Sequence, residues 1–421
     1  MRGDTYPLIY YFQKVDEGGA LIVDDHYYER LLSKVEKTID NCSDEAITLS
    51  DYLANHPEVS EHEFQSSKKH VELLSCHGFE VEYPFLGIPT AFCATKSNGE
   101  GAKVALLVEY DALPEIGHAC GHCLHGAMST LAAIGLASVF DEVKGELLVI
   151  GTPAEETNGA KVTMAEQGVF DDLDLAIMIH SSGNKSYVKY KSLAMDAIEF
   201  SYKGKPAHAA SAPWEGRNAL NGVQLFFHAI DMLRQHVKPE VRMHGIIYKG
   251  GDAPNIVPEM AICRFYFRAP TRAYLDYLVD RVRRIALGAA MASETEVTMK
   301  NFEFSFDNMI ENKTAEEKMA EIMKELGIEL SEPEGYEGSS DMGNVSYRCP
   351  ALQPKLAISD VPLVTHSREF ADAVVTPRAH EALILGSKAL ARIALAVYLD
   401  EDLRSAIKED FKKAKEQEEV F

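Results

Sequence analysis

The segment at residues 103–127, KVALLVEYDALPEIGHACGHCLHGA, constrains the fold of this chain more than any other. Its first part is an apolar run at residues 104–108 that predicts a strand buried on both faces. This run is followed in the sequence by closely spaced acidic, imidazole and thiol side chains: Glu109, Asp111, Glu115, His118, Cys120, His122, Cys123 and His125. Open α/β sheets bind ligands at the carboxyl ends of their strands. The segment therefore predicts an α/β protein with a metal or redox site at the edge of a parallel sheet.

Two later apolar runs end in the same way. Residues 147–152 lead into Glu155 and Glu156, and residues 175–179 lead into His180. Two adjacent carboxylates are costly to bury unless a cation accompanies them, although a pair on a solvated face carries no such cost. Three strands that end in potential ligands predict that these side chains meet at one edge of the sheet.

The hydrophobic pattern changes at about residue 192. From there to residue 301 it predicts strand, helix, two strands, helix and strand, the βαββαβ order of a small ferredoxin-like domain. A chain of 421 residues is long enough for two domains. We therefore predict a discontinuous catalytic domain at residues 1–191 and 302–421, with an inserted domain at residues 192–301.

The amino-acid composition limits the kinds of partner and the cellular compartment that we expect for this chain. The net charge of −23 argues against nucleic acid or an anionic membrane as a partner, because its field would repel both. The seven cysteines are odd in number and widely spaced, which is typical of the reducing cytosol rather than of a disulfide framework. The apolar stretch at residues 131–140 is too short to span a bilayer, and the one at residues 382–399 carries Lys388 and Arg392. We expect a cytoplasmic protein without a membrane span.

Three kinds of site are compatible with the cysteines and histidines. Cys120 and Cys123 form a C-x-x-C sequence, so a thiol–disulfide oxidoreductase is one alternative, although Ala119 stands where redox motifs commonly have an aromatic residue. A structural zinc site would need a second pair of ligands, and none lies nearby in the sequence. A catalytic centre of one or two divalent ions, Zn²⁺ or Mn²⁺, suits thiol, imidazole and carboxylate donors. One carboxylate of the Glu155–Glu156 pair could take the proton of a water that such a centre activates. This arrangement indicates hydrolysis of an amide.

Seven motifs between about residues 49 and 399 resemble one family in sequence and in order. They are HPEVSEHEF, VEYDALPEIGHACGH, GTPAEE, KGKPAHAASAPWEGRNAL, GGDAPNIVPE, SSDMGNVS and THSREFADA. On these motifs the chain is similar to the aminoacylase/carboxypeptidase G family of co-catalytic metallopeptidases, in its branch of aminobenzoyl-glutamate hydrolases, N-acyl-amino-acid hydrolases and β-alanyl dipeptidases. The resemblance implies a zinc-exopeptidase-like three-layer α/β catalytic domain and a ferredoxin-like lid through which two chains form a homodimer.

The resemblance also implies a role for each motif residue. The implied metal ligands are Cys120, His122, Glu156, His180 and His366. Glu155 would be the general base, and Asp111 the carboxylate that supports the metal site from behind. The wider family has H-x-D where this chain has Glu109-Tyr110-Asp111, so the usual first histidine ligand is missing, as in the cysteine-containing branch.

The predicted lid holds three further candidates. His208 matches a histidine that reaches the partner's active site in dimeric relatives and polarises the scissile carbonyl. Asn255 matches a residue of the substrate-binding loop, and Arg268 stands where it would grip a substrate carboxylate. The simpler interpretations are a loop histidine, a turn asparagine and a strand-end arginine. Two classes of small-molecule substrate are compatible with the sequence: dipeptides of the β-alanyl or basic type, and N-acyl amino acids. Cys123, where relatives have Asn or Asp, has no assigned role.

Overall fold

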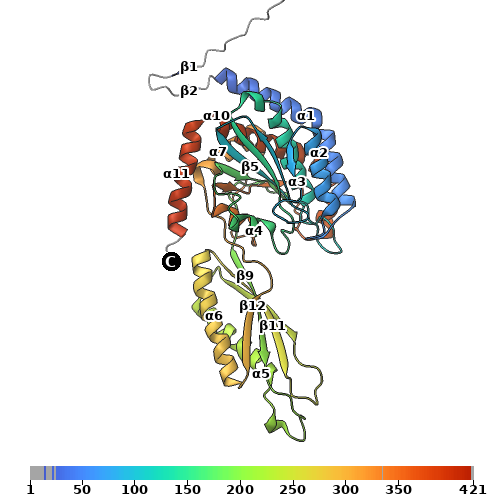
Figure 1. Cartoon of the computed structure of the whole chain (residues 1–421), viewed down its shortest axis with the longest axis vertical. Coiled ribbons are helices and arrows are strands. Elements are labelled where there is room, and N and C mark those ends of the chain that lie inside the picture. The colour runs from blue at the N-terminus through green and yellow to red at the C-terminus, as the bar shows by residue number, and fades with distance from the viewer. Residues whose placement is uncertain (1–13, 16–20, 23–24, 334, 419–421) are drawn as a thin grey trace, which may run out of the picture.

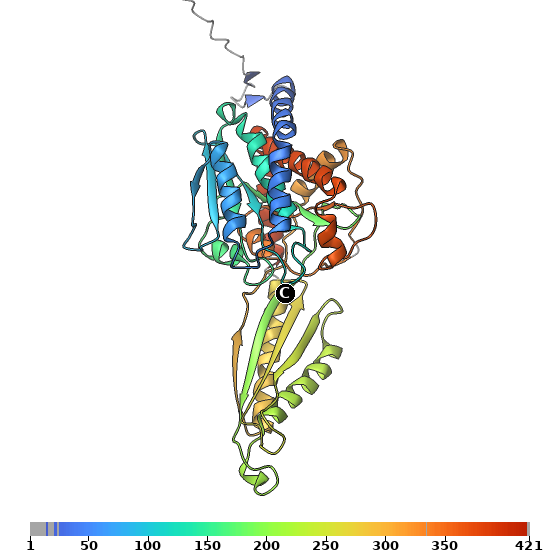
Figure 2. The same ribbon diagram turned by 90° about the vertical axis from the view of Figure 1, so that its right-hand side faces the viewer.

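The computed structural model describes residues 14–15, 21–22, 25–333 and 335–418, with side chains from residue 26 onward. These residues form two bodies that follow each other along the long axis of the molecule (Figure 1). The larger body is a mixed sheet between layers of helices, and the smaller body is an antiparallel sheet with two helices. After a turn of 90°, the smaller body is seen to project from one end of the larger (Figure 2).

A six-stranded sheet forms the middle of the larger body. Its strands, in spatial order, are β13 (Ala351–Leu352), β7 (Leu175–Ile177), β5 (Ala102–Val108), β6 (Gly145–Gly151), β4 (Phe92–Ser97) and β3 (Glu80–Glu82). The first four are parallel; β4 runs antiparallel to β6, and β3 runs antiparallel to β4 at the edge of the sheet. β5 contains the apolar run at residues 104–108 and has a parallel neighbour on each side, as its sequence predicts.

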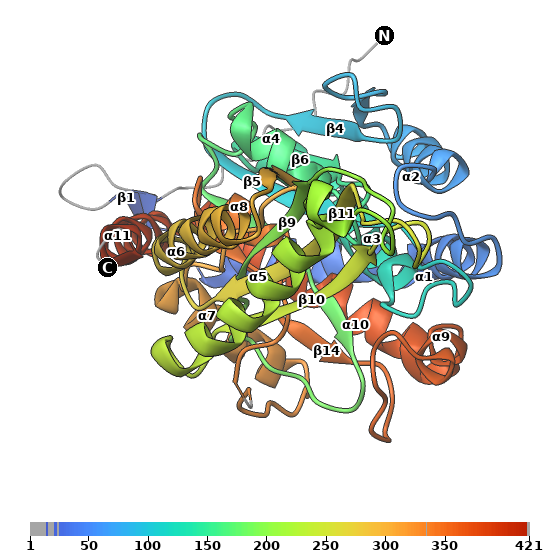
Figure 3. The same ribbon diagram turned by 90° about the horizontal axis from the view of Figure 1, so that it is seen from below.

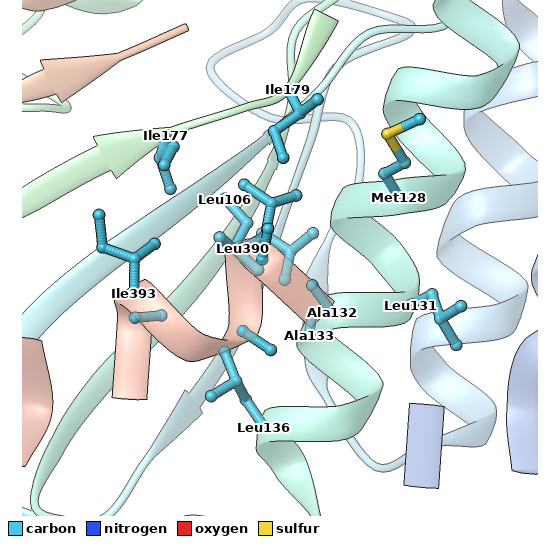
Figure 4. Packing of buried hydrophobic residues seen from close by; sticks show 14 of the residues in the cluster. Leu106, Met128, Leu131, Ala132, Ala133, Leu136, Ile177, Ile179, Leu390 and Ile393 are labelled. Carbon is cyan, nitrogen blue, oxygen red and sulfur yellow. The ribbon is translucent and has the colours of Figure 1, made fainter. Parts of the chain in front are cut away.

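Helices cover both faces of this sheet. They are α1 (Asp25–Asn55), α2 (Phe64–Cys76), α3 (His122–Ala137), α4 (Ala160–Glu166), α7 (Lys313–Glu325), α8 (Met342–Ser346), α9 (Arg368–Ala373), α10 (Pro377–Leu399) and α11 (Glu401–Glu418). Leu106 of β5 lies in the core formed with α1, α3 and α10 (Figure 4). Its neighbour Leu107 points the other way, into a core formed with α4 and α8. A strand buried on both sides has no polar face, which explains why β5 is apolar throughout.

Among the described residues, α10 is the one helix with the length and hydropathy of a membrane span. It is a core helix here, because 72% of its most apolar window is buried inside the protein. Leu390 of α10 lies beside Leu106 of the sheet (Figure 4). The apolar character of α10 therefore follows from its place between the sheet and the helices α1 and α3.

The smaller body is a four-stranded antiparallel sheet in the order β10, β11, β9, β12. Its elements are β9 (Ala194–Lys203), α5 (Ala219–Leu233), β10 (Arg242–Lys249), β11 (Met260–Ala269), α6 (Arg272–Ala292) and β12 (Glu296–Asn301). Phe200 and Phe265 of the sheet share one core with Phe226 of α5 and Leu278 of α6. Figure 3 views the molecule from this end, with α5 and α6 in front of the larger body. The chain order is the βαββαβ order that the sequence predicts for the ferredoxin-like unit.

α1 stops at Asn55, two residues before Pro57, since the residue before a proline avoids helical geometry. One predicted element has other bounds. The strand expected at residues 175–179 ends at Ile177, and His180 instead opens a separate strand, β8 (His180–Ser182), paired with β14 (Lys355–Ala357). Pro354 stands between β13 and β14, and because it has no N–H to donate, the ladder is interrupted there.

The remaining short elements are β1 (Lys14–Val15) and β2 (Leu21–Ile22), which pair with each other, and 3-10 turns at Phe140–Glu142, Pro213–Glu215 and Arg234–His236.

Candidate active site

Asp111 lies three residues beyond the end of β5, and its buried carboxylate organises the site. Its Oδ1 lies 2.9 Å from Nδ1 of His122, the first residue of α3. Its Oδ2 accepts the backbone N–H of Glu156 at 3.0 Å and the hydroxyl of Ser60 at 2.9 Å. The carboxylate thus joins the ends of β5 and β6 to the start of α3.

The imidazole of His122 is oriented as a metal ligand would be. Nδ1 lies 2.9 Å from Oδ1 of Asp111, and an N–H donated there leaves Nε2 as the nitrogen that can bind a metal. This buried Nε2 has no hydrogen-bond partner among the described residues, and it lies 3.5 Å from Oε2 of Glu109, 3.8 Å from Oε2 of Glu155 and 3.9 Å from Oε1 of Glu156. A buried imidazole nitrogen that faces carboxylates without a hydrogen bond to any of them fits a cation between them.

Cys120, His180 and His366 complete the cluster. Sγ of Cys120 lies 3.4 Å from Nε2 of His180, whose Nδ1 bonds to the carbonyl of Ser181 at 2.7 Å. Nε2 of His366 lies 3.3 Å from Oε1 of Glu156. The donor atoms of Cys120, His122 and His180 lie within 4.8 Å of one another, and so do those of Cys120, Glu156 and His366. The five predicted ligands, although far apart in the sequence, therefore meet at one place.

Glu155 lies beside this cluster. Burial, and then the negative charges of Glu109 and Glu156, raise the pKa of the Glu155 carboxyl well above its ordinary value. A raised pKa makes a carboxylate a stronger base, which suits it to accept and return a proton. The geometry and the electrostatics both suit Glu155 to the role of general base.

A buried ion triad that the sequence did not predict lies behind the cluster. Nζ of Lys161, in α4, lies 2.7 Å from Oε1 of Glu109 and 2.7 Å from Oδ1 of Asp341, and all three side chains are fully buried. Nδ1 of His125 donates to Oε2 of Glu109 at 3.2 Å, and Nε2 of His125 accepts the N–H of Ser181 at 2.8 Å. The triad thereby fixes the start of β8. Since both nitrogens of His125 are engaged, it is a structural residue and not a ligand.

A second carboxylate outside the prediction, that of Glu63, holds the backbone from which Glu155 projects. Glu63 is fully buried, and its Oε1 accepts the N–H of Ala154 at 2.9 Å while its Oε2 accepts the hydroxyl of Thr90 at 3.0 Å. Ala154 has φ +64°, a left-handed conformation that non-glycine residues rarely adopt. Glu63 therefore stabilises a strained turn immediately before Glu155.

Replacing Glu63 by leucine is expected to lower kcat by about 10²-fold, because a small displacement of a catalytic group is costly. Glu63→Gln, which still accepts the N–H of Ala154, should keep most of the activity. Glu58 of the same motif is the matched control, since its carboxylate accepts the N–H groups of Gln65 and Ser66 at the start of α2. Glu58→Leu should cost about 1 kcal/mol of unfolding free energy, as the loss of a helix cap does, and leave kcat unchanged. Equal kcat losses in both leucine variants would contradict the positioning role.

The C-x-x-C alternative finds no support in the structure. Burial raises the pKa of the Cys120 thiol and of the Cys123 thiol to about 12 in each case, whereas a redox-active cysteine needs access and a lowered pKa. Cys123 lies in the apolar core shared by α1 and α3. His118 is buried as well, and burial lowers its pKa to about 3, so its imidazole is neutral.

Two of the three lid candidates, His208 and Asn255, lie away from the cluster of their own chain. His208 and Asn255 are exposed, and the N–H of Ala209 donates to the carbonyl of Asn255 at 3.0 Å. His208 follows the distal end of β9, whose ten residues span about 30 Å, and Asn255 lies in the loop between β10 and β11 beside it. Arg268 lies at the opposite end of the smaller body, where its Nη1 donates to Oγ of Ser339 at 3.0 Å.

The matched span of a known family includes the whole cluster. The model of peptidase family M20/M25/M40 matches residues 105–384, which contain Asp111, Glu155 and all five predicted ligands. The chain belongs to this family. M20 enzymes depend on metal, and the thiol, imidazole and carboxylate groups around the unpaired Nε2 of His122 fit that requirement.

Relatives of this M20 chain include two Xaa-Arg dipeptidases that match almost from end to end. The one from Mus musculus is 33% identical over 411 residues, which are 93% of this chain and 95% of the relative. The one from Homo sapiens is 34% identical over 420 residues, covering 93% and 94%. A p-aminobenzoyl-glutamate hydrolase component from Escherichia coli (strain K12) is 32% identical over 299 residues, covering 66% and 62%.

A solved M20 structure has the same fold. The dinuclear metal binding peptidase from Bacillus subtilis superposes with a TM-score of 0.63 at 20% identity, covering 89% of this chain and 99% of that one. Membership of the family confirms the expected α/β peptidase fold and the expected class, a metal-dependent hydrolase of the metallopeptidase or amidohydrolase type.

Proposed function

We propose that this M20 chain is a dipeptidase that cleaves small dipeptides with a basic C-terminal residue. The observation that carries the chemistry is the buried Nε2 of His122, which faces Glu155 and Glu156 without bonding to either. The identity of 33% and 34% to two Xaa-Arg dipeptidases over nearly their whole length supports the substrate class. The net charge of −23, which favours cationic ligands, supports it as well.

A second candidate is hydrolysis of an N-acyl amino acid. It is supported by the similarity to the aminobenzoyl-glutamate hydrolase component, which covers 66% of this chain. The two candidates share the metal cluster and differ only in the groups that flank the scissile amide.

One or two divalent ions, Zn²⁺ or Mn²⁺, would be held by Cys120, His122, Glu156, His180 and His366. A bound ion supplies Lewis acidity, which polarises the amide carbonyl and makes a water more acidic. Glu155 takes up the proton of the attacking water on its carboxylate and returns it to the nitrogen of the leaving amine. Asp111 keeps the imidazole of His122 and the backbone of Glu156 in place throughout.

A panel of three substrates tests this assignment: β-alanyl-lysine, an N-acetyl amino acid and aminobenzoyl-glutamate. We expect the highest kcat/KM for β-alanyl-lysine. Chelation should abolish this activity, and addition of Zn²⁺ or Mn²⁺ should restore it. A higher kcat/KM for aminobenzoyl-glutamate would favour the second candidate, and hydrolysis that survives chelation would contradict both.

We further propose that two chains form a homodimer through the smaller body and that His208 acts in the partner's site. β10 is an edge strand, and its residues Ile246, Ile247 and Tyr248 are 61%, 48% and 57% exposed. An apolar edge strand is a surface to which a second chain can add. A histidine delivered by the second chain would donate to the scissile carbonyl and stabilise the charge that develops on its oxygen.

Mixed dimers of two inactive variants test the role of His208. We expect Glu155→Gln and His208→Ala to be inactive as pure proteins. In a mixed dimer, the site on the His208→Ala chain keeps Glu155 and receives His208 from the other chain. Random pairing should restore about a quarter of the wild-type activity, because half of the dimers are mixed and each holds one complete site. Mixed dimers that form but stay inactive would contradict the proposal.

A cytoplasmic location is also proposed. All seven cysteines are free thiols, as a reducing compartment would keep them. Fractionation of cells that express the tagged chain would test this.

A further inference from the structure

Lys355 extends from β14 toward the metal cluster. β14 pairs in parallel with β8, and in this register Lys355 stands opposite His180. Paired residues of neighbouring strands send their side chains to the same face of a sheet. Lys355 therefore shares a face with His180, whose Nε2 lies 3.4 Å from Sγ of Cys120.

Lys355 lies largely buried and forms no ion pair among the described residues. Lys355 is 8% exposed, and within the described part of the chain its Nζ has one partner, the ring of Tyr190, with 4.7 Å between Nζ and the ring centroid. Lysine is almost never buried to this extent unless it is paired. Lys161, which is also buried, shows the usual solution, with two carboxylates at 2.7 Å.

We propose that Lys355 binds the substrate carboxylate next to the scissile amide, which in a dipeptide is the C-terminal carboxylate. This inference rests on the proposed function, since it assigns the group that recognises that substrate. A carboxylate beside Nζ forms a charge-assisted hydrogen bond and gives Lys355 the ion pair that it lacks among the described residues. Arg268, which the sequence suggested for this task, already donates to Ser339 from the other body.

The test compares an acid and its amide. Kinetics of β-alanyl-lysine and β-alanyl-lysinamide are measured with the wild-type holoenzyme, Lys355→Met and the control Lys388→Met. Lys388 also belongs to the larger body, but it pairs with Asp40 of α1 at 2.8 Å. For Lys355→Met we expect kcat/KM to fall about 30-fold or more on the acid and less than about threefold on the amide, because only the acid carries the charge that Lys355 pairs with. Lys388→Met should change neither.

Binding of free lysine and lysinamide, measured by titration calorimetry, gives a second readout that needs no turnover. Wild type should bind lysine more tightly than lysinamide, and Lys355→Met should bind both equally. Metal content and the unfolding midpoint of each variant show whether it is folded, and Lys355→Gln replaces Lys355→Met if the latter is not. Equal losses on acid and amide, or an unchanged preference for the acid, would overturn the proposal. If the wild type cleaves no dipeptide, and the preference for lysine over lysinamide is nevertheless lost in Lys355→Met, the proposed substrate is rejected and the role of Lys355 is kept.

Discussion

Glu155→Gln is expected to lower kcat by about 10²–10⁴-fold, the contribution that a positioned general base makes, while the metal content stays at the wild-type level. Glutamine has nearly the same shape but accepts no proton from water at neutral pH. Glu155 is suited to this role by its place 3.8 Å from Nε2 of His122 and by a pKa that burial and the neighbouring carboxylates raise. Steady-state kinetics combined with elemental analysis of the purified variant provide the measurement.

Glu156→Gln is the matched control, because the two carboxylates are adjacent in the chain and both face His122. Oε1 of Glu156 lies 3.3 Å from His366, so this variant removes a predicted ligand and should lose metal together with activity. Metal loss in Glu155→Gln with retention in Glu156→Gln would reverse the two roles. Full turnover in Glu155→Gln would remove it from the mechanism.

Lys161→Met is expected to lower the free energy of unfolding at pH 7 by about 3–5 kcal/mol, because it leaves two buried carboxylates without their cation. Glu109 and Asp341 each lie 2.7 Å from Nζ of Lys161 in a fully buried triad. In the variant, burial raises the pKa of both carboxyls in the folded state above their values in the unfolded chain. The deficit should therefore be largest at neutral pH and shrink as the pH falls and the folded state takes up protons.

Arg348→Met serves as the control for the triad. Its ion pair with Asp171 is exposed by 40% and 44%, so its loss should cost less than about 1 kcal/mol. Denaturant unfolding of both variants at pH 7 and pH 5.5 gives the comparison. Equal costs for the two variants, or a deficit in Lys161→Met that grows as the pH falls, would contradict the account of the triad.

The sequence predicted the parts of the site that depend on strand ends. Glu155 and Glu156 directly follow an apolar strand, and the carboxyl ends of parallel strands meet at one edge, so their approach to His122 follows from topology. His180 was placed correctly near the cluster but on the wrong element, because the interruption at Pro354 depends on a strand more than 170 residues away.

The carboxylates and lysines behind the cluster were not predicted, because their roles depend on partners distant in the sequence. Glu63 and Ala154 are 91 residues apart, and Lys161 and Asp341 are 180 apart. One local signal was available: Lys161 and Lys355 each stand in an otherwise apolar segment, AKVTMA and PKLAI. A lysine in such a segment predicts either a buried partner or a ligand, and the structure shows the first for Lys161 and supports the second for Lys355.

The cluster around His122 is expected to be a metal centre that hydrolyses an amide. Elemental analysis of the wild-type protein, purified without chelator and assayed before and after chelation, tests it most directly. We predict about one to two equivalents of Zn or Mn per chain, with activity that is lost on chelation and restored by metal. A metal-free protein that hydrolyses amides at an undiminished rate, or one that reduces disulfides through Cys120 and Cys123, would contradict the claim.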